Sequence, residues 1–241
     1  QGSAVVVRTR QHSLLFDAGP RWSAQADAGE RIVVPVLRAR GIAPDAMVVS
    51  HADSDHAGGA ASVQQAFPAM HRIGAGGEPC VLGQEWHWDG VQFEILHPFQ
   101  PIPAAPSASN ANSFVLRVAS QTGQRLLLMG DIEARQEAAL VRRGMALQAD
   151  VMVVPHHGST TSSSAMFLSA VQPSVAIVQA GYRNRFGHPA ASVLERYAAL
   201  GSHVVSTPSC GAVHWRSWQP GAVQCERAIA RRYWAQSVQA P

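Results

Sequence analysis

Two histidines and two aspartates lie within six residues of this chain, at His51, Asp53, Asp55 and His56. The apolar run just before them, residues 47–49, is typical of a buried strand, and residues 60–67 just after them have helical spacing. A loop between a strand and a helix can turn several side chains towards one point. Nitrogen and oxygen donors around one point suit Zn²⁺, Mn²⁺ or a similar divalent ion. The alternative is an ordinary polar loop, but turn chemistry does not require two His and two Asp at alternating positions.

This segment resembles the His-x-His-x-Asp-His signature of the metallo-β-lactamase superfamily, with Asp53 in place of the second histidine. The same replacement occurs in the ComEC competence proteins, and residues 129–133, 154–159 and 184–189 match that family too. In order and spacing the resemblance runs from residue 1 to about residue 215. It implies an α/β fold, the αββα sandwich, in which two mixed β-sheets pack face to face with helices outside.

The resemblance also implies a dinuclear metal centre. One ion would be held by His51 and Asp53, and the other by Asp55, His56 and His156, with Asp131 as the bridge. We prefer His156 to His157 because it directly follows a strand and Pro155. His157 would then contact phosphate or support a ligand. Asp131 could instead cap the helix that follows it, and Asp17 either supports the metal loop or simply ends a strand.

Four residues are candidates for catalysis: Asp55, Asn112, His157 and His188. Asn112 occupies the position of a superfamily histidine. Because an amide is a weak metal ligand, we expect it to orient a water or a phosphate oxygen, or else to cap a turn. His188 lies in a loop rich in Arg and Asn, where it could contact the scissile phosphate or protonate the leaving oxygen. Arg183 and Arg185 either bind phosphate or are solvated.

A site rich in carboxylates is harder than one built of histidines, which favours Mn²⁺ or Mg²⁺ over Zn²⁺. Two such ions, about 3.5–4 Å apart, suit phosphodiester hydrolysis. We therefore interpret the chain as a nuclease that acts on DNA, single-stranded above all. The ComEC resemblance implies an inner-membrane-associated domain on the periplasmic side, partnered by the transmembrane channel of its parent protein. It would degrade the strand that is not imported during natural transformation. The alternatives are hydrolysis of a small ester, lactone or phosphodiester, and an inactive domain that binds DNA.

Composition sets wider limits. The 241 residues suffice for one large domain or two small ones. We expect a single domain, with a core to about residue 216 and a tail, 217–241, without an assigned role. The chain starts as if inside a strand, so we expect a piece of a larger protein, and no run approaches the ~18 apolar residues of a membrane span. The net charge of +3 permits a polyanionic partner. All basic residues are Arg, which we attribute to coding bias. Cys80, Cys210 and Cys225 imply no disulfide framework, although one pair is possible.

The pattern of apolar residues also predicts the secondary structure. We expect a hairpin over residues 5–17, a loop over 21–30, and an exposed loop over 98–106. Helices are expected over 32–40, 60–67, 133–143, 162–171 and 190–200. Further strands are expected near residues 73 and 81–82 and over 91–96, 114–119, 125–129, 150–155 and 175–179, while strands 203–207 and 211–215 would close the second sheet. His87 and His97 are expected to be ordinary turn or edge histidines.

Overall fold

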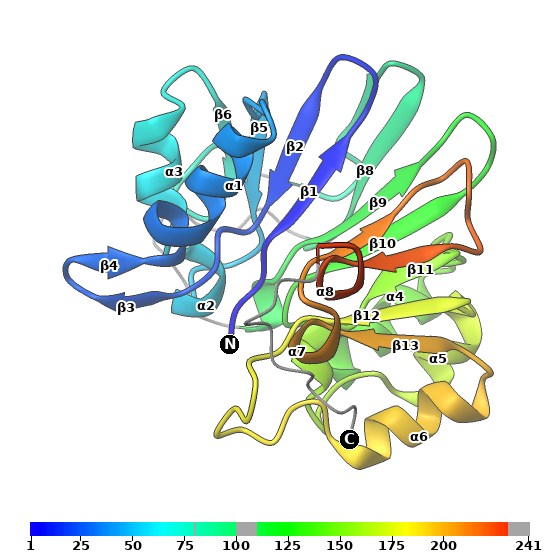
Figure 1. The fold of residues 1–241 in the computed structure, drawn as a ribbon. Helices are drawn as coiled ribbons and strands as arrows, with labels where there is room; N and C mark the ends of the chain where they lie inside the picture. Colours follow the sequence, from blue (N-terminus) through cyan, green and yellow to red (C-terminus); the bar gives the residue numbers. More distant parts are fainter. Residues whose placement is uncertain (80, 100–109, 231–241) are drawn as a thin grey trace. The chain divides into compact units, whose positions relative to one another are not determined.

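The computed structural model describes residues 1–79, 81–99 and 110–230 of the chain (Figure 1). It divides into two compact units, the first made of residues 1–117 and 128–132, and the second of residues 118–127 and 133–241. Most of the expected loop over 98–106, Cys80 and the end of the expected tail lie outside the described residues.

The first unit contains a four-stranded mixed sheet. Its strands are β1 (Val5–Arg8), β2 (Ser13–Phe16), β5 (Ala46–Val49) and β6 (His71–Gly74), in the order β1-β2-β5-β6. β1 pairs antiparallel with β2, which confirms the expected hairpin, while β5 runs parallel to both of its neighbours. Every residue of β2 and β5 is buried, as expected for the apolar runs that form them.

Two helices, α1 (Val34–Ala39) and α3 (Ala60–Ala66), pack on one face of this sheet (Figure 1). Leu15 and Met47 point to that face and belong to one buried cluster with Leu37 and Val63 of the helices. Each fully buried Leu or Met side chain contributes roughly 1.5–3 kcal/mol. The packing therefore holds the carboxyl end of β5, from which the His51 loop starts.

Two parts of the first unit differ from the expected secondary structure. Residues 21–30 are not simply a loop, because β3 (Arg21–Ser23) and β4 (Ala26–Asp27) form a small hairpin that leads into a π-helical turn, Gly29–Val33. The strands of this hairpin are mostly exposed, so no apolar alternation marked them. A one-turn helix, α2 (Ser54–Ala57), also forms within the candidate metal loop itself.

The larger sheet has seven strands, and those from β8 to β13 are labelled in Figure 1. They are β7 (Glu85–Trp88), β8 (Val91–His97), β9 (Val115–Ala119), β10 (Arg125–Met129), β11 (Val151–Val153), β12 (Val175–Val178) and β13 (His203–Ser206). Their order is β13-β12-β11-β10-β9-β8-β7, with β10 to β13 parallel and β7 antiparallel to β8. The expected strand at residues 81–82 is absent, because the partner of β8 is β7, where Trp86 stacks on Phe93.

Three helices of the second unit connect successive parallel strands (Figure 1). They are α4 (Ala134–Arg142), α5 (Ala165–Val171) and α6 (Ala191–Ala199). They bury Leu140, Phe167 and Tyr197. Strands followed by helices give the α/β class that we expected, with two mixed sheets flanked by helices.

The end of the second unit differs from the expectation. β14 (Val213–Trp215) does not close the larger sheet but pairs with β15 (Val223–Cys225) in a separate two-stranded sheet. A one-turn helix, α7 (Thr207–Cys210), turns the chain away after β13, and another, α8 (Glu226–Ile229), follows β15. Cys210 and Cys225 form a disulfide, so part of the expected tail is tied to the body of this unit.

Candidate metal centre

Asp17 holds the candidate metal loop, residues 50–56, through hydrogen bonds to Ser50 and His56. It lies at the carboxyl end of β2, next to the end of parallel β5, and is fully buried. Its Oδ1 accepts a hydrogen bond from the backbone N–H of Ser50 at 2.7 Å. Its Oδ2 accepts from Ser50 Oγ at 2.9 Å and from His56 Nδ1 at 2.7 Å. One carboxylate thus fixes both the start of the loop and an imidazole six residues further on.

His51 presents a buried lone pair. Since the hydroxyl of Ser50 donates to Asp17, its Oγ accepts from Nδ1 of His51 at 3.0 Å, which leaves the lone pair on Nε2. Burial, with the nearby His56, lowers the pKa of His51, so this ring is neutral at pH 7. Its Nε2 is buried and makes no hydrogen bond within the described chain, and it lies 3.5 Å from Asp53 Oδ2 and 4.0 Å from Asp131 Oδ2. A lone pair beside two carboxylates is what a cation would stabilise.

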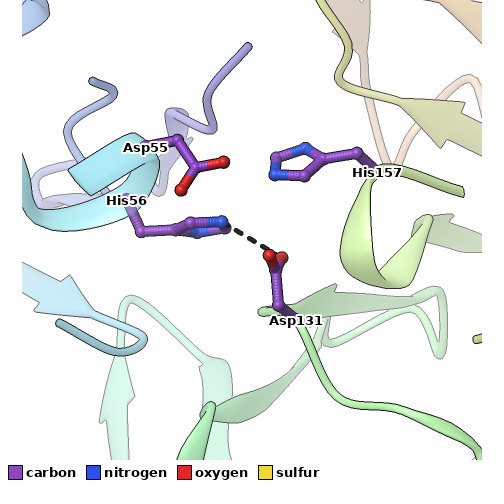
Figure 2. Close-up of side chains that lie close together, drawn as sticks. All are labelled: Asp55, His56, Asp131 and His157. Carbon is purple, nitrogen blue, oxygen red and sulfur yellow. Dashed lines mark ion pairs between the residues drawn. The ribbon is translucent and has the colours of Figure 1, made fainter. Parts of the chain in front are cut away.

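His56 lies between two carboxylates. Nδ1 bonds to Asp17, and Nε2 lies 3.0 Å from Oδ1 of Asp131 (Figure 2). Burial opposes protonation, but the charges of Asp17 and Asp131 outweigh it and hold the pKa of His56 well above its usual value. A carboxylate that accepts from the Nδ1–H of a metal-binding histidine is a common support for such a ligand. Both histidines therefore fit a divalent ion.

Asp131 follows β10, where Gly130 allows three segments to meet. A Cβ atom on Gly130 would lie 2.8 Å from Cβ of Ser113 and 2.9 Å from Cβ of Ser50, so only glycine fits. The N–H of Asp131 donates to Ser113 Oγ at 3.0 Å. α4 is capped by Glu133, in a capping box with Gln136, so Asp131 is not the cap of this helix. The structure therefore does not bear out the alternative in which the carboxylate of Asp131 caps the helix that follows it.

Asp55, His56 and Asp131 each offer a ligand atom, and these atoms lie within 4.8 Å of one another (Figure 2). Asp53 stands at the N-cap position of α2, but its side chain makes no capping hydrogen bond. The predicted ligands of the first unit therefore lie close together: His51, Asp53, Asp55, His56 and Asp131. Figure 2 also draws His157, which belongs to the second unit.

Asn112 closes a 3-10 turn, Asn110–Asn112, directly before Ser113. His97 Nδ1 donates to the carbonyl of Ser113 at 2.7 Å and holds this segment in place. His97 is thus a satisfied buried histidine, as expected, and His87 is exposed on β7. The part of Asn112 in orienting water or phosphate stays a prediction.

The two adjacent histidines of the second unit differ in environment. Both have positive φ, 49° at His156 and 53° at His157, a conformation that is costly for residues other than glycine. His157 is buried and donates from Nδ1 to the carbonyl of Gln179 at 2.7 Å. That bond leaves the lone pair on Nε2, the state of a metal-binding imidazole. The side chain of His156 is 20% exposed, and its Nδ1 lies 3.2 Å from Thr161 Oγ1 and 3.4 Å from Glu133 Oε1.

A buried carboxylate that the sequence did not reveal stabilises the segment after these histidines. Glu137 of α4 is fully buried and accepts from the backbone N–H groups of Ser163 at 2.5 Å and Ser164 at 2.8 Å. Burial raises the pKa of Glu137. Tyr197 adds a hydroxyl contact of 3.1 Å to Ser163 Oγ. A glutamate three residues before Leu140, on the apolar face of its helix, was the signal that could have identified it.

The family model described as the metallo-beta-lactamase superfamily matches residues 1–112. A curated relative, "Competence protein ComA" of Neisseria gonorrhoeae, is 36% identical over 97% of the chain. The chain belongs to the metallo-β-lactamase superfamily. Members of this superfamily are generally metal-dependent hydrolases, and their fold implies divalent metal ions, in agreement with the donors found here.

"Recombination protein 2" of Haemophilus influenzae is 35% identical over 91% of the chain. The chain spans only 33% of the first of these relatives and 28% of the second. In three dimensions it resembles the metallo-β-lactamase-fold protein YhfI from Bacillus subtilis, with a TM-score of 0.53, 13% identity and coverage of 85% of this chain and 88% of that one. The superfamily fold expected from the sequence is thereby confirmed.

The loop after β12 carries the remaining candidates of this superfamily domain. Asn184 organises it through four hydrogen bonds, two of them with the backbone of His188. Arg183 has a positive φ of 50°. The catalytic role of His188 and the phosphate contacts of Arg183 and Arg185 stay predictions. Across residues 1–79, 81–99 and 110–230, no helix combines the length and apolar character needed to cross a bilayer.

Proposed function

We propose that this domain is a metal-dependent nuclease that hydrolyses phosphodiester bonds of DNA, with Mn²⁺ as the preferred ion. The observation that carries the proposal is the buried Nε2 of His51, which has no hydrogen bond in the described chain and faces Asp53 and Asp131. A site of two imidazoles and three carboxylates in one unit is harder than a histidine-rich one.

The proposed ligands of the first unit are His51, Asp53, Asp55, His56 and the bridging Asp131. For the second unit we propose His157 and no longer His156. The support is its burial, together with the Nδ1–H bond to Gln179, which places the lone pair on Nε2. His156 is more exposed, and its Nδ1 lies near Thr161 and Glu133, an environment that suits a loop contact.

When bound, the two ions would supply a hydroxide at neutral pH and neutralise charge on the phosphoryl group. The chain's own residues do the remaining work. Asp17 and Ser50 keep both loop imidazoles in the tautomer that presents Nε2. Asn112 would orient the water or a phosphate oxygen, and His188 would give a proton to the leaving oxygen, a step typically worth ~10²–10⁴-fold.

DNA is proposed as the substrate because of the relatives and the charge. One relative is named as a competence protein and another as a recombination protein. The sequence pI of about 9.1 also suits a polyanion. We further propose that the domain is attached to the membrane channel of a longer DNA-uptake protein, on the extracytoplasmic side, where it degrades the strand that is not imported. The disulfide between Cys210 and Cys225 supports an oxidising compartment.

The experiment combines metal analysis with a DNA-degradation assay. Chelation should abolish degradation of single-stranded DNA, and Mn²⁺ should restore it better than Zn²⁺. Equal or better rescue by Zn²⁺ would contradict the hard-site argument. Hydrolysis of a lactone or small ester with intact DNA would favour that other class of hydrolase, and metal-free DNA binding without turnover would favour an inactive domain. His188→Ala should lower kcat while metal content stays unchanged.

A further inference from the structure

The loop that follows β12 exposes two aromatic rings. Tyr182 is 59% exposed and Phe186 is 55% exposed. Single exposed apolar side chains are common on protein surfaces. Here two rings lie four residues apart, each next to an arginine in sequence, and residues 180–190 contain no Asp or Glu. A loop of this composition suits a ligand that offers flat apolar surfaces together with negative charge.

The loop is held in shape before any ligand arrives. The side-chain amide of Asn184 donates to the carbonyls of Gly181 at 3.0 Å and His188 at 2.6 Å. Its Oδ1 accepts from the N–H groups of Phe186 at 3.2 Å and His188 at 3.1 Å. Since one side chain ties both ends of the segment together, less conformational freedom would be lost when a ligand binds to the rings.

Both arginines lie against the rings. The Arg183 guanidinium carbon is 5.2 Å from the centroid of the Tyr182 ring, and that of Arg185 is 4.8 Å from the Phe186 ring. Such cation–π contacts keep the positive charges beside the aromatic surfaces. Phe186 also stacks on His188, with a centroid distance of 5.8 Å and an interplanar angle of 17°. The exposed rings and charges therefore adjoin the predicted proton donor.

We propose that this loop binds a single nucleic acid strand, with bases stacked on Phe186 and Tyr182 and phosphates paired with Arg183 and Arg185. The inference rests on the proposed nuclease function, and it adds the reason why single strands would be preferred. In a duplex the base faces are covered by neighbouring bases, whereas in a single strand they are available to aromatic side chains. The absence of acidic residues from the loop agrees with a polyanionic ligand.

The first test measures binding of a fluorescent oligothymidylate by anisotropy, with EDTA present so that nothing is cleaved. Phe186→Ala should weaken binding by about 5- to 150-fold, the usual range for loss of one base–aromatic stack. Phe186→Trp should preserve it. Phe186→Leu keeps an apolar side chain next to His188 but has no aromatic face, so it should bind as weakly as the Ala variant. Met166→Ala, which removes a 48% exposed apolar side chain from α5, is the matched control and should bind like the wild type.

A second arm uses the same strand with abasic sites. Wild-type protein should bind it more weakly, and Phe186→Ala should cause no further loss, because the stacking partner is already missing. Arg185→Gln should reduce the salt dependence of strand binding by about one phosphate contact, a slope change of about 0.7.

These outcomes separate the inference from the proposed function. Normal strand binding by Phe186→Ala and Phe186→Leu would overturn the inference even if the wild type degrades DNA. If strand binding depends on Phe186 but no DNA is degraded, the inference that the loop binds a strand would stand and the proposed nuclease function would be refuted. If Phe186→Ala instead disrupted only self-association, seen by analytical ultracentrifugation, the rings would be a protein contact and the inference would be wrong.

Discussion

Substitution of Asp17 by Asn tests how the metal site is built. Asparagine has nearly the same shape and tolerates the left-handed conformation of Asp17, whose φ is 60°. Three donors converge on the Asp17 carboxylate: the N–H and Oγ–H of Ser50, and Nδ1–H of His56. An amide offers only one oxygen to accept them, and its NH₂ group would face one of the donors. We expect His56 to lose its hydrogen bond to residue 17, so that its proton moves from Nδ1 to Nε2.

The magnitude follows from the role of this carboxylate. If His56 no longer has an acceptor for Nδ1–H, the neutral ring carries its proton on Nε2. That nitrogen faces Asp131 and would then have no lone pair for a metal. Loss of such a supporting partner typically reduces metal affinity by about 10–100-fold, equivalent to about 1.4–2.7 kcal/mol. Mn²⁺ affinity can be measured by competition with a fluorescent chelator. Asp45→Asn is the matched control, since Asp45 Oδ2 accepts from the N–H of Ser13 at the other end of β2. Its Mn²⁺ affinity should match the wild type.

The same assay tests the pKa of His56. In the metal-free protein this pKa is raised by Asp17 and Asp131 against the effect of burial, so a metal must displace the proton from Nε2. Mn²⁺ affinity should therefore rise with pH until the raised pKa of His56 is passed, and become constant above it. Asp17→Asn removes one of the two charges, so the rise should end at a lower pH. Wild-type affinity with an unchanged pH profile in this variant would refute the reasoning.

Two further predictions concern the second unit. His157→Ala should reduce the bound metal measured by atomic absorption, while His156→Ala should retain it. The reason is that the bond to Gln179 fixes the lone pair on Nε2 of His157. Loss of metal in His156→Ala alone would instead identify His156 as the ligand. Replacing Cys210 and Cys225 together by Ser should lower the free energy of unfolding in urea by about 3 kcal/mol, because the bridge joins residues 15 apart in sequence. An unchanged unfolding midpoint would show that this bridge adds no stability.

The sheets could be predicted from sequence where strands are buried on both faces. The apolar runs at residues 14–16, 47–49, 126–129 and 175–178 all lie in strands. Such runs are a reliable signal because a strand covered by helices must be continuously apolar. The polar residues directly after these runs were therefore placed correctly at strand ends.

The exposed elements could not be predicted in the same way. The hairpin formed by β3 and β4 has mostly exposed residues, so its sequence resembles a loop. The pairing of β14 with β15 depends on α7, which turns the chain after β13, and on the bridge between Cys210 and Cys225. Neither a turn of four residues nor the choice of one cysteine pair among three cysteines is encoded in apolar spacing.

The candidate site shows a second limit, because hydrogen bonds between distant residues decide which donor faces a metal. His156 and His157 are adjacent and of the same type, and they differ in burial and in the bond from His157 to Gln179, 22 positions away. Glu137 was missed for the same reason, since its partners at Ser163 and Ser164 lie 26 and 27 positions away. Residue types identify the available chemistry, whereas the tautomer that makes an imidazole a ligand depends on tertiary contacts.

Backbone conformation offers an independent guide to these same positions. Among the described residues other than glycine, positive φ occurs at Asp17, Asp89, His156, His157, Ser163, Gln172 and Arg183. Four of these seven are residues that the sequence singled out for chemistry. Such conformations cost roughly 1–3 kcal/mol each and persist where surrounding contacts hold them. Here the contacts are visible: buried hydrogen bonds fix Asp17 and His157, and the network of Glu137 fixes Ser163. Four residues selected for their side chains thus also have a strained backbone, which is the pattern expected where a side chain must be held in one direction.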